Sequence, residues 1–202
     1  MKKRILYSML IAASTMVGFA SCDSFLEENP RDQITEEQAY KNSTLIYLNT
    51  VASLYTQVGG SSGGAGLQGT DRGIYDLNTF TTDEAMLPTR GGDWYDGGLW
   101  ENMYQHKWNA NDINLYNVWK YLFKVIVLSN QSLSIIDSHQ TLLSAEQTRD
   151  FTAEVRAVRA LFYYYAMDMF GRVPIVTSYD VKLEQVTQSE RSEVFKFIVD
   201  EL

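Results

Sequence analysis

Two long stretches of helical periodicity, joined by a short linker, constrain the fold of this chain more than any other feature. Apolar residues recur along one broad face over residues 112–137 and again over residues 145–170. The linker, about seven residues at 138–144, is short enough to force the two helices into an antiparallel pair. In the second stretch the apolar positions alternate between steps of four and three residues, at Phe151, Val155, Val158, Phe162, Tyr165 and Met169. The sequence therefore predicts a mainly α fold.

Local signals mark both ends of the second long helix. Ser144 followed by Gln147 has the spacing of a capping box, in which each residue bonds a free backbone N–H near the helix start. Gly171 and Pro174 provide a C-terminal glycine and a proline stop. We therefore expect this helix to span residues 145–170.

Two further helices are expected nearer the ends of the chain. Thr35 and Gln38 form a second capping-box spacing, and helical periodicity follows over residues 36–58. A last helix is expected to begin near Ser192, and the chain reaches Leu202 about two or three turns later without a glycine, a proline or a cap. Because so short a helix is marginal alone, we expect a helical domain that is truncated at its C-terminus.

The N-terminus has the organisation of a secretory signal. Three basic residues at positions 2–4 precede an apolar, small-residue run at 5–20, which is too short for a spanning helix. Cys22, the only cysteine, follows directly. We predict a lipoprotein signal peptide at 1–21, lipidation of Cys22 and a tether over 22–34. The alternative is an ordinary secreted protein with an incidental cysteine.

Composition argues against several classes of function. The formal net charge is −8 and there is no basic stripe, which argues against nucleic-acid binding. Two histidines and one cysteine leave little material for a zinc site or a histidine-based triad. Neither a phosphate-binding glycine loop with its lysine nor a Gly-x-Ser-x-Gly elbow is present. We therefore expect no cofactor and no resident metal.

The tract from residue 59 to about residue 109 is expected to be irregular. Seven of the 13 glycines lie between residues 59 and 73, and three of the four tryptophans, Trp94, Trp100 and Trp108, follow in the same tract. A structureless stretch of this length is uncommon in a compact domain unless it has a function. We expect Trp108 and Trp119, the latter on a helical face, to lie in the core.

The segment 82–100 combines aromatic rings with carboxylates and an arginine. A tryptophan or tyrosine can cover the apolar face of a sugar ring, and the charged groups can bind its hydroxyls. The predicted ligand-binding residues are Trp94, Tyr95, Trp100, Asp83, Arg90, Asp93 and Asp96. The alternative interpretation is that the tryptophans only fasten a long loop to the helices.

Other charged residues in the chain have simpler interpretations. Asp83 and Glu84 are adjacent, and this spacing does not show the carboxylate separation of about 5–10 Å that a glycosidase needs. No EF-hand calcium pattern appears. Arg156 and Arg159 are one turn apart, and we expect them to pair with carboxylates of a neighbouring element.

Three segments of the chain match the pattern of one known family. They are the lipoprotein start that runs into residues 22–30, the arginine- and aromatic-rich helix at 153–165 that is closed by 170–176, and the segment 191–202. The helix that ends in Phe-Gly-x-Val-Pro is the most specific of the three. Together, over nearly the whole chain, they resemble the N-terminal part of a SusD/RagB-family nutrient-uptake lipoprotein.

This resemblance implies a lipid-anchored protein on the outer face of the outer membrane of Bacteroidota-type bacteria. Family members bind glycans, or in some cases peptides, and act as a lid on a TonB-dependent, SusC-like transporter; they are not enzymes. The resemblance also implies a tetratricopeptide-like helical layer with long loops, of which residues 35–202 would be an incomplete N-terminal part. Two alternatives stay open: a lipid-anchored polysaccharide hydrolase, and a structural lipoprotein that serves as a protein-docking surface.

Overall fold

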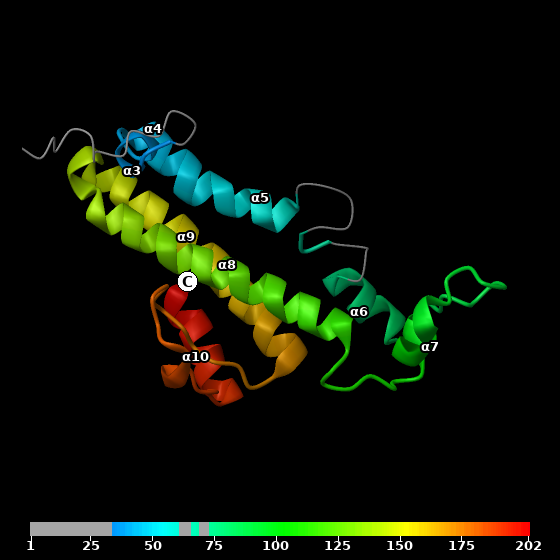
Figure 1. Cartoon of the computed structure of the whole chain (residues 1–202). Coiled ribbons are helices and arrows are strands. Elements are labelled where there is room, and N and C mark those ends of the chain that lie inside the picture. The colour runs from blue at the N-terminus through cyan, green and yellow to red at the C-terminus, as the bar shows by residue number, and fades with distance from the viewer. Residues whose placement is uncertain (1–33, 61–65, 69–72) are drawn as a thin grey trace, which may run out of the picture. The chain divides into compact units, whose positions relative to one another are not determined.

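The structure is a computed structural model that describes residues 34–60, 66–68 and 73–202 (Figure 1). The predicted signal peptide and Cys22 lie outside the described residues. The chain divides into two compact units, Met1–Gln38 and Ala39–Leu202. In the first unit, Thr35 and Gln38 bond each other's backbone N–H at 3.3 Å, as the predicted capping box requires, at the start of helix α3 (Glu36–Ala39).

Two long antiparallel helices form the centre of the second unit. Helix α8 (Ile113–Ser138) and helix α9 (Ala145–Phe170) lie side by side and are joined by a single 3₁₀ turn at Gln140–Leu142 (Figure 1). The predicted helix pair is therefore confirmed, with bounds within one residue of those expected. The fold is mainly α, built on this tetratricopeptide-like pair.

Side-chain caps fix the starts of both long helices. The Asp112 carboxylate accepts the N–H of Asn114 at 2.9 Å and so satisfies a free donor in the first turn of α8. At the start of α9, the Ser144 hydroxyl accepts the Gln147 N–H at 3.1 Å, and the Gln147 side chain accepts the Ser144 N–H at 3.0 Å. The predicted capping box is confirmed. Gly171 ends α9 with a φ of 72°, a conformation that favours glycine.

The core lies between α8, α9 and the helices packed on them. Its members are apolar side chains that repeat at helical spacing, so each helix buries one face. The largest side chains that are almost completely buried are Tyr163, Phe162, Ile46, Leu54, Met103, Leu122, Ile126 and Ile136. Trp119 is partly buried and packs on Phe123 and Phe170, with ring centroids 4.4 and 5.1 Å away, as its position on the helical face predicted.

The prediction of one continuous helix over residues 36–58 is wrong. Helix α4 (Ser43–Tyr47) begins anew because Asn42 adopts an extended backbone and its side chain accepts the Leu45 N–H at 3.0 Å. A π-helical turn (Leu48–Ala52) then leads into α5 (Ser53–Gly59). In this turn the buried Thr50 hydroxyl donates to the Ile46 carbonyl at 2.6 Å, in competition with the backbone ladder.

The tract from 59 to 109 is less irregular than predicted. Where it is described, it contains two short helices, α6 (Ile74–Phe80) and α7 (Leu99–Tyr104). Each buries only two large apolar side chains, Ile74 and Leu77 in α6 and Trp100 and Met103 in α7. Two apolar positions are too few to produce a recognisable helical period, and helices of this length depend on tertiary packing.

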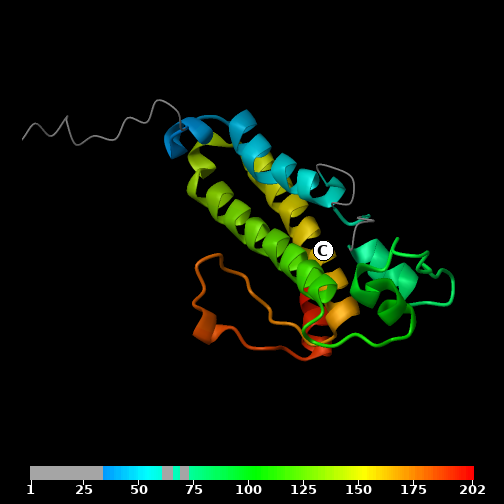
Figure 2. The same ribbon diagram turned by 45° about the vertical axis from the view of Figure 1, so that its right-hand side comes forward.

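The chain returns to α9 through a long connection and a final helix. After Gly171 an extended segment forms one antiparallel bridge, Pro174 to Gln188, and the Ser189 N–H donates to the Val173 carbonyl at 3.0 Å. Between Pro174 and Gln188 the chain forms a long loop that contains one 3₁₀ turn (Leu183–Gln185). It then enters α10 (Arg191–Glu201), which packs on α9 (Figure 2). The helix predicted to begin near Ser192 is confirmed. None of the helices in the described residues is long and apolar enough to cross a membrane.

Candidate functional site

The loop between α6 and α7 carries most of the predicted ligand-binding residues. Arg90 and Asp93 are brought together by a tight turn, in which the Arg90 N–H donates to the Asp93 carbonyl at 3.1 Å and the Asp93 N–H donates back at 3.0 Å. Gly91, inside this turn, has a φ of 65°, which favours a residue without Cβ. Both charged side chains are exposed. The turn therefore presents a cation and an anion next to each other in solvent.

Trp94 and Tyr95 follow this turn and are the exposed aromatic residues of the loop. Trp94 is 49% exposed and Tyr95 is 55% exposed. Trp94 has a φ of 58°, a left-handed conformation that is uncommon for a bulky residue and that marks a sharp change of chain direction. Its ring lies edge-on to the ring of Trp100, with centroids 6.2 Å apart. Trp94 therefore packs on the buried Trp100 while about half of its own surface stays exposed.

Trp100 is buried, which contradicts its prediction as a ligand-contacting residue. Only 3% of its surface is exposed, because it sits on the buried face of α7 against Phe80, with ring centroids 5.2 Å apart. Its indole N–H donates to the Asp96 carboxylate at 2.8 Å. For Trp100 the alternative interpretation holds: it fastens the loop to the helices, and the predicted binding residue Asp96 is part of that attachment.

Asp83, the remaining predicted site residue, is exposed just after α6. Within the described residues, no hydrogen bond or ion pair joins its side chain to Arg90, Asp93 or Asp96. The structure thus brings together Arg90 with Asp93 through the backbone, and Trp94 with Trp100 and Asp96 through side chains. It does not tie Asp83 to either group.

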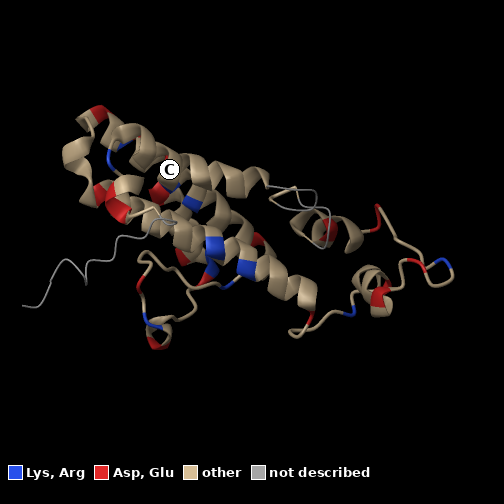
Figure 3. Cartoon of the chain, turned by 45° about the horizontal axis from the view of Figure 1, so that its top comes forward, with Lys and Arg blue, Asp and Glu red and all other residues tan. Residues whose placement is uncertain are grey.

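Acidic residues predominate around this loop. Between residues 73 and 112 there are seven Asp and Glu and only two Lys and Arg, and Figure 3 shows red segments outnumbering blue ones along α6, α7 and their loops. In the part of the chain that the structure describes, no three His, Cys, Asp or Glu side chains come together where they could hold a metal ion. This charge pattern favours neutral ligands over anionic ones.

Trp108 was predicted to be a core residue, and this prediction is wrong. Its side chain is 41% exposed and borders a cavity of about 250 Å³ between α6, α7, α8 and the end of α9. Its ring packs on the His106 ring, with centroids 5.2 Å apart. A signal was present in the sequence: residues 105–107 and 109 are all polar, so Trp108 belongs to no apolar stripe.

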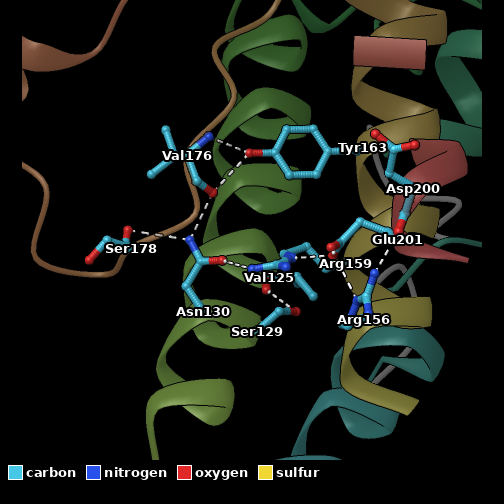
Figure 4. A network of polar contacts seen from close by, with 10 residues as sticks. All are labelled: Val125, Ser129, Asn130, Arg156, Arg159, Tyr163, Val176, Ser178, Asp200 and Glu201. Carbon is cyan, nitrogen blue, oxygen red and sulfur yellow. Dashed lines mark hydrogen bonds and ion pairs between the residues drawn. The ribbon is translucent and has the colours of Figure 1, made fainter. Parts of the chain in front are cut away.

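Arg156 and Arg159 of α9 form ion pairs with a carboxylate of a neighbouring helix, as the sequence predicted. Figure 4 shows Arg156 and Arg159 converging on Glu201, near the end of α10. Arg159 Nε lies 2.6 Å and Arg156 Nε 3.3 Å from its carboxylate oxygens. The Arg159 and Glu201 side chains are only 7% and 8% exposed, so this is a buried ion pair. Pairing with a neighbouring element is confirmed, and it ties α10 to α9.

The same network extends to α8 and to the segment after α9. Arg159 Nη1 donates to the Asn130 side-chain oxygen at 2.8 Å, and the Asn130 amide donates to the Val176 carbonyl at 2.9 Å (Figure 4). The buried Tyr163 hydroxyl donates to the Val176 carbonyl at 3.0 Å and accepts the Val176 N–H at 2.7 Å. These polar groups are therefore structural, since they satisfy one another inside the protein.

The burial of Tyr163 leads to a prediction about stability at high pH. Desolvation raises the pKa of Tyr163 to about 12, whereas tyrosine in an unfolded chain titrates at about 10. Between these values the unfolded chain loses a proton that the folded chain keeps, so the free energy of unfolding falls as the pH rises from about 10 to about 12. Urea denaturation across this range measures the decline.

The variant Tyr163→Phe is the control for this effect. It removes the titrating group, so its decline in stability over the same pH range is expected to be shallower than that of the unmodified chain. Burial also raises the pKa of Tyr121 to about 12. In the variant, Tyr121 therefore still contributes to the loss of stability between about pH 10 and about pH 12. If the free energy of unfolding falls equally steeply with pH in both proteins, the loss of stability at high pH is not due to Tyr163.

The described part of the chain is a mainly helical scaffold that presents exposed aromatic rings and charged side chains on the loop between α6 and α7. The chain belongs to the SusD-like family: a family model described as "Starch-binding associating with outer membrane" matches residues 24–200. The resemblance seen in the sequence is thus confirmed.

Individual relatives show the same affiliation. The chain is similar to a SusD-like protein of Bacteroides ovatus, with 23% identity over 201 residues, or 96% of this chain and 33% of the relative. It is 28% identical over 161 residues to SusD-like protein P25 of Formosa agariphila, covering 78% of this chain and 29% of the relative. The chain therefore spans about a third of the length of these relatives.

Solved structures agree with the fold. A laminarin-binding SusD-like protein superimposes with a TM-score of 0.61 and 26% identity, over 80% of this chain and 33% of that protein. A SusD-superfamily protein from Bacteroides fragilis superimposes with a TM-score of 0.60 and 15% identity, over 81% of this chain and 38% of that protein, a likeness of fold alone.

Proposed function

We propose that this chain is part of a cell-surface lipoprotein that captures glycans for import through a TonB-dependent, SusC-like transporter of the outer membrane. The observation that carries the proposal is the exposed pair Trp94 and Tyr95, held on a supported loop. The family description, starch-binding and associated with the outer membrane, and the laminarin-binding neighbour support a glycan rather than a peptide as ligand.

The binding mechanism follows from the chemistry of the loop. The ring of Trp94, with Tyr95 beside it, covers the apolar face of a sugar unit, and Asp93 and Arg90 bond hydroxyls at its edge. Asp83 is a further candidate for hydroxyl contacts. The ligand is held and released without covalent chemistry, so we propose no catalytic residue and no cofactor.

Attachment to the membrane is proposed to depend on lipid at Cys22, followed by the tether at 22–34. Without residues 1–21 the chain keeps 14 Lys and Arg against 25 Asp and Glu, a net charge of −11, so no basic patch would hold it on anionic lipid. Acyl chains can supply durable anchoring by themselves when more than one is attached. This arrangement would hold the helical domain at the outer membrane, next to the transporter.

Replacement of Trp94 by alanine is expected to weaken glycan binding about tenfold, because an exposed stacking ring contributes about 1–2 kcal/mol to a contact of this kind. Isothermal titration of the full chain in detergent with laminarin, and separately with soluble starch, measures the effect. The variant should fold like the unmodified chain, since its ring is half exposed.

Tyr179→Ala is the matched control for this experiment. Tyr179 is 53% exposed but lies on the connection between α9 and α10, so its loss should leave glycan binding unchanged. Equal binding by Trp94→Ala and the unmodified chain would refute the role of this ring. Absence of binding to both glycans by the unmodified chain would refute the proposed function for this part of the protein.

A further inference from the structure

We propose that the cavity beside Trp108 is a second glycan subsite, which accepts one neutral sugar ring and rejects acidic sugars. The inference rests on the proposed function but concerns residues separate from the Trp94 loop. The cavity has a volume of about 250 Å³, and its lining includes Leu77, Asn78, Met103, Trp108, Asp168 and Phe170. Its volume lies below the range of about 300–1,000 Å³ that is usual for drug-sized ligands, which suits a single ring.

The apolar part of the cavity offers a surface for a sugar face. Leu77 and Met103 are 6% and 2% exposed and form a buried floor, and Phe170 adds a partly buried aromatic ring. Trp108, at 41% exposure, is the most accessible large apolar side chain of the lining. A ring that is open on one side and bordered by apolar groups is suited to stacking on a pyranose.

Trp108 is supported by its contact with the ring of His106. The neighbouring His106 ring packs on it, and His106 Nε2 lies 2.7 Å from the Thr81 carbonyl oxygen. His106 has a φ of 57°, and its N–H donates to the Met103 carbonyl at 3.1 Å. The loop after α7 is thus fixed to α6 and α7, which positions Trp108 before any ligand arrives, and preorganisation of this kind lowers the entropy cost of binding.

The polar edge of the cavity has free hydrogen-bonding capacity. Asn78 and Asp168 are exposed, and within the described residues neither side chain forms a hydrogen bond or an ion pair. An amide and a carboxylate together can donate to and accept from sugar hydroxyls. The apolar floor, the aromatic ring and these two groups form the combination that a single sugar unit requires.

The charge of the lining determines which sugars fit. Asp112 and Asp168 are both part of it, and it contains no lysine or arginine. A uronate or a sulfated sugar would bring a third negative charge to these carboxylates without a cation to offset it. A neutral ring meets no such repulsion, so the subsite selects neutral glycans.

The test compares two probes on the full chain in detergent: a neutral laminarin oligosaccharide and an acidic oligogalacturonate of equal length. Titration calorimetry is expected to show at least tenfold tighter binding of the neutral probe. Trp108→Ala should weaken neutral binding about fivefold or more, additionally to the loss caused by Trp94→Ala, since the two rings belong to separate subsites. Asp168→Asn should narrow the difference between the two probes.

Matched controls keep the outcomes separate. Tyr116, which is 53% exposed on α8 and does not line the cavity, should be replaceable by alanine without effect. If Trp108→Ala misfolds, Asp168→Asn still tests the proposal. Because the Asp168 side chain is exposed, this variant should fold, and its ratio of affinities for the neutral and acidic probes can be measured. If Trp108→Ala binds the neutral probe as the unmodified chain does, the proposed subsite is wrong. The same holds if the unmodified chain binds both probes equally. Neither result contradicts the proposed glycan-binding function. No binding of the neutral probe by the unmodified chain overturns the proposed function as well.

Discussion

Replacement of Glu201 by alanine is expected to lower the free energy of unfolding by about 3–5 kcal/mol. The carboxylate lies 2.6 Å from Arg159 Nε and 3.3 Å from Arg156 Nε, and Arg159 is only 7% exposed. Without Glu201 the buried Arg159 guanidinium keeps, among the described residues, the neutral Asn130 oxygen and the face of the Phe197 ring, and no carboxylate to offset its charge. An uncompensated buried charge costs more than the ion pair contributes, which is why removal of one partner is severe.

Urea denaturation of the full chain, followed by circular dichroism, measures this loss. Asp200→Ala is the matched control, because Asp200 lies on the same helix and pairs with Lys196, but at 58% and 75% side-chain exposure. An exposed pair of this kind contributes about 0.3–0.5 kcal/mol. If Glu201→Ala and Asp200→Ala lose equal stability, the buried ion pair is not what holds α10 against α9.

Replacement of Trp100 by alanine is expected to cost about 3–5 kcal/mol, the range for removal of a large buried aromatic side chain. Trp100 is 3% exposed, packs against Phe80 and supports Trp94. Its loss leaves a cavity beneath the loop and deprives Asp96 of the indole N–H. We therefore expect both lower stability and weaker glycan binding, although Trp100 itself is buried.

Two further variants separate these effects. Trp100→Phe keeps a ring in the packing and loses the hydrogen bond to Asp96, so the cost should fall to about 1–3 kcal/mol. Trp94→Ala, at the exposed ring, should leave stability within about 0.5 kcal/mol of the unmodified chain while glycan binding weakens about tenfold. Should Trp100→Ala unfold at the same urea concentration as the unmodified chain, Trp100 would not be the structural anchor of the loop.

The residues whose loss should lower stability thus differ from those whose loss should lower affinity alone. Glu201 and Trp100 are buried and act through packing and charge compensation. Trp94 and Trp108 are exposed, and we propose that they act through contact with ligand. A variant set that includes both kinds can distinguish a binding protein from a purely structural lipoprotein, because only the binding protein loses affinity without losing stability.

The sequence by itself determined the central helix pair. In α9 the apolar positions alternate between steps of four and three residues from Phe151 to Met169, which places them on one face, and local caps at Ser144 and Gly171 fix the ends of the helix. The pairing of Arg156 and Arg159 was also predictable, since two charges one turn apart on a buried helix need a carboxylate. These features follow from interactions near in sequence or from strong periodicity.

Tertiary structure decided which of the tryptophans are exposed. Trp94, Trp100 and Trp108 share one glycine-containing tract without periodicity, so nothing local distinguishes a buried ring from an open one. Trp100 is buried because α7 packs that face on Phe80, and Trp108 is open because His106 holds it at the edge of a cavity. The same reason explains α6 and α7: helices of seven and six residues persist only through contacts with residues far along the chain.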